Sequence, residues 1–203
     1  MIKKTYSFTS SIALLAMLAS FSPARADNIS DFYAGGFGGR AWTKTDVSGG
    51  PTFNLHPDDW GAFVGYNLGS LDRQSNIGLE GGLEAHYAWA NSGEETNPVG
   101  GVSTILKKKH EWGLDLRPGL AVISQAMPLN LRPYAIVGYR QAAFEDSVTG
   151  SSSHSGFALG LGTELVTYQH FGIRLDYDHV FYRSVDGIDP HENDLRLGVA
   201  YHF

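Results

Sequence analysis

The segment "DLRLGVAYHF", residues 194–203, alternates strictly between large apolar side chains and small or polar ones. One set of alternate positions holds Leu195, Leu197, Val199, Tyr201 and Phe203. Successive side chains of a β-strand point to opposite faces of its sheet, so the segment predicts a strand with one apolar face. Whether that face meets a protein core or lipid decides the fold.

Strand-like patterning recurs along the chain, without a sustained helical period. The predicted strands are residues 31–42, 59–68, 77–89, 110–122, 131–144, 155–166, 171–182 and 194–203. A tilted strand needs about 9–11 residues to cross a bilayer, and each segment is near that length. The connections after the first, third, fifth and seventh segments are longer than most of the others. This alternation of long and short connections is typical of an up-and-down membrane barrel.

The polar faces of these segments carry a nearly balanced set of charges separated by glycines. The carboxylates are Glu80, Glu84, Asp115, Glu164, Asp176 and Asp178. The cations are Arg117, Arg132, Arg140, Arg174 and Arg196. A solvated face would be richer in Lys, Ser and Thr, whereas Arg suits confined, bidentate pairing with carboxylates. We therefore expect the polar faces to line a barrel interior and the apolar faces to contact lipid.

Aromatic residues gather at the strand ends. Trp60, Trp89 and Trp112 lie near the long connections, and Tyr66, Phe171, Tyr201 and Phe203 lie near the short ones. Two such girdles are expected at the two membrane interfaces. A soluble sandwich or lipocalin-type barrel shares the alternation but buries its apolar face. The girdles favour an all-β fold, an eight-stranded antiparallel up-and-down transmembrane β-barrel. The glycine-rich segment "DFYAGGFGGRAW", residues 31–42, leaves its two faces unassigned.

Residues 1–26 have the organisation of a signal peptide. A pair of lysines precedes a short apolar stretch, and "ARA", residues 24–26, provides a small-x-small cleavage site. The apolar stretch is shorter than the about 20 residues of a spanning helix. We expect cleavage after Ala26 and a single β-barrel domain over 27–203, with an uncleaved helical anchor as the alternative.

Composition argues against several classes of site. The net charge of −6 disfavours a nucleic-acid partner, and the absence of Cys excludes disulfides and thiolate metal sites. The eight histidines show no helical metal-ligand spacing, although His56, His154 and His191 fall in predicted outer loops and could meet in space. We expect no metal and no cofactor.

The end of the chain, "GIRLDYDHVFYRSVDGIDPHENDLRLGVAYHF", resembles the last two strands of the OmpA-type transmembrane domain and of opacity-type outer-membrane proteins. The matching residues are Arg174, Leu175, Tyr177, Leu195, Leu197, Gly198, Tyr201 and Phe203. The resemblance implies location in the outer membrane of a Gram-negative bacterium, with outer-membrane lipid, lipopolysaccharide and host surface molecules as partners. It also implies that Tyr201 and Phe203 are the signal read by the barrel-assembly machinery. The alternative is that Phe203 only fills the aromatic girdle.

The same resemblance implies a structural or surface-interaction role, in envelope integrity or in adhesion through the extracellular loops. It supports a lumen network of ion pairs that closes the barrel, whereas a small-solute pore is the alternative. The candidate network is Glu80, Glu84, Asp115, Arg117, Arg132, Arg140, Glu164, Arg174, Asp176 and Arg196.

Two further features suggest contact with lipopolysaccharide. The segment "LKKKHEW", residues 106–112, contains Lys107, Lys108 and Lys109, which form either a phosphate clamp or a solvated strand end. Tyr177 and His179 resemble the Tyr-x-His of outer-membrane lipid A deacylases. Those enzymes place a nucleophilic Ser two residues after the His, where this chain has Phe181. Nucleophilic catalysis then has no evident nucleophile. We therefore expect that the protein is not an enzyme, and a lipid A-modifying activity is the less favoured alternative.

Overall fold

The computed structural model describes residues 27–28, 30–47, 50–72, 75–91, 94–99, 102–124, 129–147, 150–167, 170–184 and 188–203. The strands within these ranges are β1 (Asp27–Asn28), β2 (Asp31–Val47), β3 (Thr52–Leu55), β4 (Asp58–Asp72), β5 (Ile77–Asn91), β6 (Glu94–Val99), β7 (Val102–Ile123), β8 (Leu129–Asp146), β9 (Gly150–Thr167), β10 (Phe171–Tyr182) and β11 (Ile188–His202). In this part of the chain, no helix has the length and apolar character needed to span a membrane. The predicted signal peptide lies outside the described residues.

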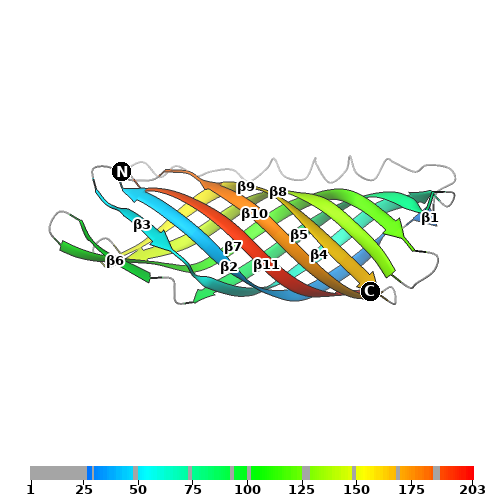
Figure 1. Ribbon diagram of the computed structural model, residues 1–203, viewed down its shortest axis with the longest axis horizontal. Coiled ribbons are helices and arrows are strands. Elements are labelled where there is room, and N and C mark those ends of the chain that lie inside the picture. The colour runs from blue at the N-terminus through cyan, green and yellow to red at the C-terminus, as the bar shows by residue number, and fades with distance from the viewer. Residues whose placement is uncertain are drawn as a thin grey trace, which may run out of the picture.

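Eight of the described strands close into an antiparallel barrel (Figure 1). Their order around the barrel is β4, β5, β7, β8, β9, β10, β11 and β2, and β2 pairs back onto β4. The closing ladder between β2 and β11 runs from Tyr33 opposite His202 to Val47 opposite Ile188. Closure leaves no open edge in the spanning part of the sheet, as lipid requires. The predicted fold class is confirmed. Each of the eight predicted segments lies in one of these strands, except that Phe203 follows the end of β11.

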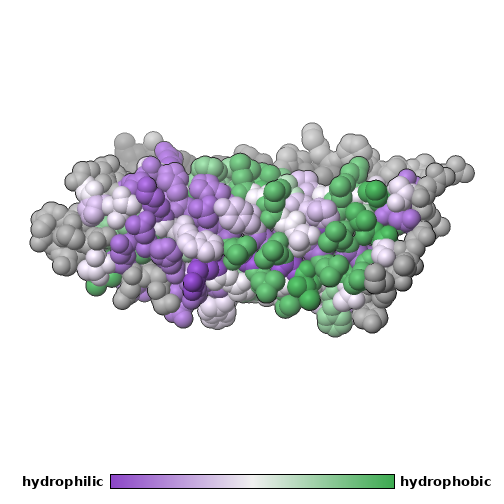
Figure 2. Space-filling view, viewed as in Figure 1, coloured by the Kyte–Doolittle hydropathy of each residue, from purple (hydrophilic) through white to green (hydrophobic). Residues whose placement is uncertain are grey.

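The apolar alternate residues face outward and the polar ones inward. In β11, Leu197 and Val199 are 60% and 63% exposed, whereas Arg196 between Leu195 and Leu197 is 5% exposed. Hydrophobic side chains gather on the outer surface over the half of the molecule in which the chain terminates, and hydrophilic ones cover the other half (Figure 2). The outer surface therefore changes from lipid-compatible to water-compatible along the barrel axis.

The strands extend further on the long-connection side than predicted, and β3 and β6 lie in segments expected to be loops. β3 continues the ladder along β2 beyond the end of β4, and β6 continues along β7 beyond the end of β5. β3 and β6 contact each other, and the Asn54 N–H donates to the Glu95 carboxylate. We call β3, β6 and the strand ends beside them the outer extension, which lies at the left of Figure 1.

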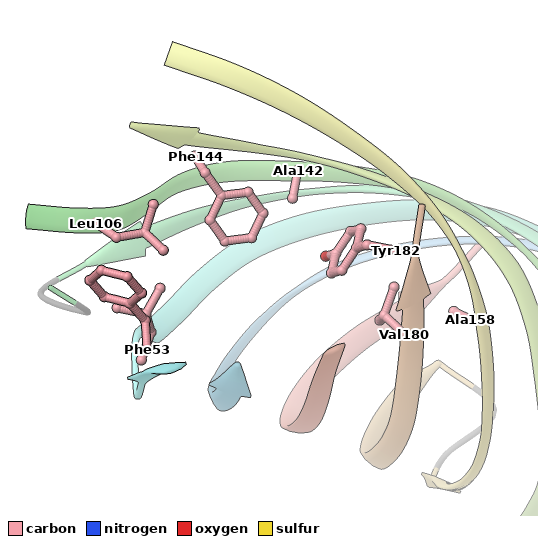
Figure 3. Packing of buried hydrophobic residues seen from close by; sticks show 8 residues of the cluster. Phe53, Leu106, Ala142, Phe144, Ala158, Val180 and Tyr182 are labelled. Carbon is pink, nitrogen blue, oxygen red and sulfur yellow. The ribbon is translucent and has the colours of Figure 1, made fainter. Parts of the chain in front are cut away.

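The interior of the outer extension is mostly apolar. Its buried apolar residues, here called the apolar cap, are Phe53, Leu55, Leu106, Ala142, Phe144, Ala158, Val180 and Tyr182, and the side chains of Thr45 and His154 are buried beside them. The labelled rings and Leu106 point into the space that the strands enclose (Figure 3). The rings of Phe144 and Tyr182 meet edge to face, with centroids 6.0 Å apart. The interior thus changes along the barrel axis, from charged side chains with a small aromatic cluster within the membrane to mostly apolar side chains beyond it.

The structure assigns the faces of the glycine-rich first strand. Phe32 and Trp42 face outward, and Tyr33 and Phe37 are buried inside with Phe63. A Cβ on Gly35 would lie 2.4 Å from the Phe63 ring and 2.1 Å from a backbone oxygen. Glycine is needed there because aromatic rings fill the narrow lumen of an eight-stranded barrel.

Candidate functional site

The centre of the membrane part is occupied by two carboxylates and two arginines that pair alternately. Glu84 of β5 accepts hydrogen bonds from Arg117 of β7 at 2.5 Å and from Arg174 of β10 at 2.6 Å. Asp176 lies 2.7 Å from Arg117 and 3.2 Å from Arg174. The Tyr134 hydroxyl donates to the other Asp176 oxygen at 2.5 Å. This ring of charges joins strands across the lumen and neutralises itself.

A second set of ion pairs lies on the side of the outer extension and centres on Arg140. Its guanidinium donates to Asp115 and, at 2.6 Å, to Asp178. The Arg140 Nε lies 3.6 Å from Glu111. The His86 ring lies between Glu111 and Asp115, at 3.6 and 3.5 Å. All five side chains are almost completely buried.

Arg196 adds a third centre that links three strands. It donates to Asp59 of β4 at 3.1 Å, to Glu111 of β7 at 2.8 Å and to Asp194 of β11 at 3.2 Å. A buried charge without a partner costs several kcal/mol. Arg196 therefore stabilises the closure of the barrel as well as the local pairs.

Lys108 is the cation nearest the apolar cap. Its ammonium group lies 2.9 Å from Glu111 and 2.5 Å from Glu192. Thr43 also donates to Glu192, and the Tyr182 hydroxyl lies 2.7 Å from Glu111 and 3.1 Å from Glu192. Because Tyr182 belongs to the cap, the charged interior and the apolar cap are in direct contact.

The three lysines of the predicted clamp do not lie on one face of the strand. Lys108 is 3% exposed and points into the barrel, whereas Lys107 and Lys109 lie outside and pair with Glu145 at 3.6 and 2.6 Å. The hydrogen bond from Lys109 holds the pKa of the Glu145 carboxyl below its usual value. The physical reason is that β7 continues through this segment, so successive side chains alternate between the inside and the outside of the barrel instead of sharing one face. The register against β8 also shifts between Lys108 and His110.

The end of the barrel at which the chain terminates carries a fourth set of pairs. His202 lies between Asp31 and Glu164, with ring nitrogens 3.0 and 3.2 Å from their oxygens. Arg132 lies 3.4 Å from Asp31 and 3.7 Å from Glu80. These groups pair across the lumen at the end opposite the apolar cap.

All ten residues of the predicted lumen network lie in the interior. Sequence reasoning left out further interior partners, namely Asp31, Asp59, Lys108, Glu111, Tyr134, Tyr182, Glu192 and Asp194. The alternation of Glu192, Asp194 and Arg196 could have revealed two of them, had the last strand been extended backward. A small cavity of about 10 Å³, next to Glu80 and Tyr134, has room for about one water molecule.

Two groups of side chains have the composition of a metal site. Glu84, His86 and Asp115 form one, and Glu111, Glu192 and Asp194 form the other; in each, the ligand atoms lie within 4.8 Å of one another. Both groups are already paired with cations of the chain, Glu84 with two arginines and Glu111 with Lys108. The three histidines predicted in outer loops do not form a site: His154 is buried against Phe144, whereas His191 pairs with Asp189.

The pair compared with lipid A deacylases faces outward. His179 Nδ1 lies 2.8 Å from the Asn193 side-chain oxygen, which also accepts from the Tyr177 hydroxyl at 3.1 Å. The ring of Phe181 lies 4.3 Å from the His179 ring, at the position where those enzymes have a serine. Asn193 orients the His179 imidazole, but the residue at the position of the serine is Phe181, whose side chain is a hydrocarbon ring.

Comparison with known families agrees with this geometry. The profile of a family described as the outer membrane protein beta-barrel domain matches residues 11–203. The chain belongs to this family. Its members are proteins of the Gram-negative outer membrane, and this protein is accordingly located there. No curated protein matches the sequence.

The chain is also similar to solved outer-membrane barrels. Neisserial surface protein A has 14% identity, with 85% of this chain and 97% of that chain covered and a TM-score of 0.45. The N-terminal β-barrel domain of Pseudomonas aeruginosa OprF has 14% identity, with 88% and 100% covered and a TM-score of 0.43. Ail of Yersinia pestis, in complex with the heparin analogue sucrose octasulfate, has 16% identity, with 85% and 99% covered and a TM-score of 0.40.

The aromatic girdles mark where this outer-membrane protein meets the two interfaces. Trp60 and Trp89 stack with ring centroids 4.6 Å apart on the side of the outer extension. On the other side, Tyr201 lies 5.3 Å from Phe171 and 5.1 Å from Phe203. Short turns of such barrels face the periplasm and longer connections face outward. The outer extension therefore lies on the extracellular side.

Proposed function

We propose that the protein is a closed structural barrel of the outer membrane, with a surface-interaction role carried by the outer extension and its loops. The single observation behind this proposal is the stacking of the apolar cap on the charged interior, through Tyr182. A path from one mouth to the other would have to cross both layers.

Each layer opposes the passage of ions for its own physical reason. Within the membrane part, opening a path would separate buried ion pairs, such as those of Arg140 and Arg196, at a cost of several kcal/mol. In the cap, an apolar constriction disfavours water and therefore hydrated ions. These two barriers favour a structural role over the small-solute pore, which is the second candidate.

The outer extension supports the surface role because it presents polar side chains on paired strands. Lys107, Lys109 and Glu145 lie outside the barrel on strands whose inner side packs in the apolar cap. Rigid strands that carry loops are a frequent platform for recognition. The partners in this proposal are lipopolysaccharide and host surface molecules. During assembly, the exposed Phe203, next to Tyr201, would be read by the barrel-assembly machinery.

Planar-bilayer recording tests the closed barrel. Purified, heat-modifiable protein is expected to give no stable channels, whereas a porin reconstituted in the same way should conduct. Stable channels of uniform size would overturn the structural proposal in favour of the pore. The surface role is tested separately, by comparing host-cell attachment and detergent sensitivity of a deletion strain complemented with the full gene or with one lacking β3 and β6.

The proposal includes no catalytic activity. Incubation with lipopolysaccharide should release no acyl chains, because Phe181 stands where a nucleophile would be needed beside His179. If the wild type releases fatty acid and the His179→Ala variant does not, the protein is an enzyme.

A further inference from the structure

The outer surface of β10, β11 and β2 carries a patch of imidazole and amine groups at the extracellular girdle. We call it the imidazole patch: Tyr177, His179, His191, Asn193 and Lys44. Asn193 lies opposite His179 in one ladder, and His191 lies opposite Lys44 in the next. These side chains share the outer face because they occupy alternate positions of neighbouring antiparallel strands.

His179 is held in one orientation. The Asn193 side-chain oxygen accepts from the Tyr177 hydroxyl and lies 2.8 Å from His179 Nδ1, so it accepts the Nδ1 proton as well. The His179 ring also packs between two other rings. It meets the Phe181 ring edge to face, with centroids 4.3 Å apart, and stacks on the His191 ring, with centroids 6.3 Å apart. With Nδ1 donating to the amide oxygen, Nε2 is the ring nitrogen left for an external partner, and it donates a hydrogen bond when the ring is protonated.

Among the described residues, His179 is the basic side chain of this patch without a carboxylate partner. Lys44 lies 3.8 Å from Asp46, and His191 lies 3.6 Å from Asp189. Within the described part of the chain, His179 forms no ion pair with Asp or Glu, and its polar partner is the neutral Asn193. A positioned imidazole whose second ring nitrogen has no carboxylate partner can, when protonated, donate from that nitrogen to an anion from outside the protein.

The position of the patch identifies the source of that anion. Leu195 follows Asn193 on the same outer face of β11 and is 40% exposed, as a lipid-facing residue would be. Trp42, an interfacial type of residue, lies opposite Asn193 on β2. The patch therefore sits where the apolar belt ends and the phosphorylated headgroups of the outer leaflet begin.

We propose that the imidazole patch binds a phosphate group of lipopolysaccharide, with protonated His179 donating from Nε2. Lys44 and His191, which pair with Asp46 and Asp189, lie beside this donor. The site takes the place of the clamp expected at Lys107, Lys108 and Lys109. It rests on the lipopolysaccharide contact proposed above, but not on the closed lumen or on recognition of a host.

Binding to lipid A in detergent micelles tests the site. Purified protein is titrated with bisphosphorylated lipid A, with dephosphorylated lipid A and with inorganic phosphate, and bound lipid is quantified by native mass spectrometry. The variants are His179→Ala and Asn193→Asp, which keeps the shape of the side chain but supplies an internal anion. His110→Ala is the matched control, because His110 stacks on Tyr87 at 5.8 Å at the same girdle but lacks the amide partner.

We expect both patch variants to weaken binding of bisphosphorylated lipid A by about tenfold or more, as loss of a charge-assisted hydrogen bond should. Binding of dephosphorylated lipid A should be weaker in the wild type and unchanged in the variants, and His110→Ala should bind as the wild type does. Heat-modifiable migration of every variant shows that the barrel is folded.

Three outcomes would overturn the proposal. If the wild type and His179→Ala bind bisphosphorylated lipid A equally, the site is wrong while the lipopolysaccharide contact stands. If no lipid binds the wild type, the contact itself fails. If inorganic phosphate displaces lipid A from the patch as effectively as free lipid A does, the site recognises a free anion and not a lipid.

Discussion

Replacement of Arg196 with methionine would remove the guanidinium that joins β4, β7 and β11 inside the barrel. Arg196 is 5% exposed and donates to Asp59, Glu111 and Asp194 at 3.1, 2.8 and 3.2 Å. Methionine is also long and unbranched, so the expected loss comes mainly from the charge. The substitution therefore measures what the ion pairs contribute to the fold.

The magnitude follows from the partners that would be left behind. Glu111 keeps Lys108 at 2.9 Å, whereas Asp59 and Asp194 have no other ion-pair partner among the described residues. Removing one partner of a buried pair costs about 3–5 kcal/mol, because the remaining charge is uncompensated. We expect the free energy of unfolding of Arg196→Met to fall by about that amount.

Urea unfolding in phospholipid vesicles, followed by tryptophan fluorescence and heat-modifiable migration, measures this loss. Arg40→Met is the control, because Arg40 pairs with Asp58 at 2.8 Å on the surface with more than half of each side chain exposed, and its loss should not be measurable. Adding Asp59→Asn and Asp194→Asn to Arg196→Met should restore part of the stability. A loss below about 1 kcal/mol for Arg196→Met would show that the ion pairs of Arg196 contribute little to the stability of the barrel.

Three further predictions follow from the same geometry. Lys108→Met should lower the free energy of unfolding by about 3–5 kcal/mol while Lys109→Met should not change it measurably, and amine labelling of folded protein should modify Lys109 and spare Lys108. Gly61→Ala should cost about 1–3 kcal/mol or prevent folding, because overpacking of a filled interior is destabilising. Its Cβ would lie 2.1 Å from a backbone oxygen, whereas Gly81→Ala meets nothing within 4 Å and should refold with wild-type yield. In Lys109→Met the pKa of Glu145 should rise towards its usual value, as measured by a carboxyl NMR titration. In the wild type this pKa is lowered, so the ion pair stabilises the fold at pH values above the usual carboxyl pKa. This contribution to stability is lost as the pH falls through the pKa that Glu145 has in the folded protein. An unshifted Glu145 titration would show that the surface hydrogen bond does not form in solution.

Much of the membrane part could be predicted from the sequence because its two faces meet different solvents. Arg196 inside and Leu197 outside follow from alternation once lipid is placed on the apolar face. The glycine-rich first strand could not be assigned this way, since rings such as Phe37 fill the lumen there and the inner face is no longer polar.

Beyond the girdle the same reasoning fails for a physical reason. Water surrounds the outer extension, so its outer face is polar and its inner face is apolar, as Phe53 and Lys109 show. An expectation of apolar outer faces and polar inner faces therefore predicts loops where these strands lie. It also places Lys107, Lys108 and Lys109 in one patch, although alternation along the strand separates Lys108 from the other two.

The strands that cross the membrane, their lipid-facing side and ten of the interior charged residues could be predicted from the sequence, because these depend on neighbours in the chain and on the solvent. The pairing of the charges required the folded barrel, since Arg196 reaches across the lumen to Asp59 and Glu111. The same holds for the segment that ends the chain. Its alternation determined which side faces lipid, whereas the register against β10 aligned Asn193 with His179 at the membrane surface. Such pairings depend on how neighbouring strands are offset around a closed barrel, and that offset is a property of the whole sheet.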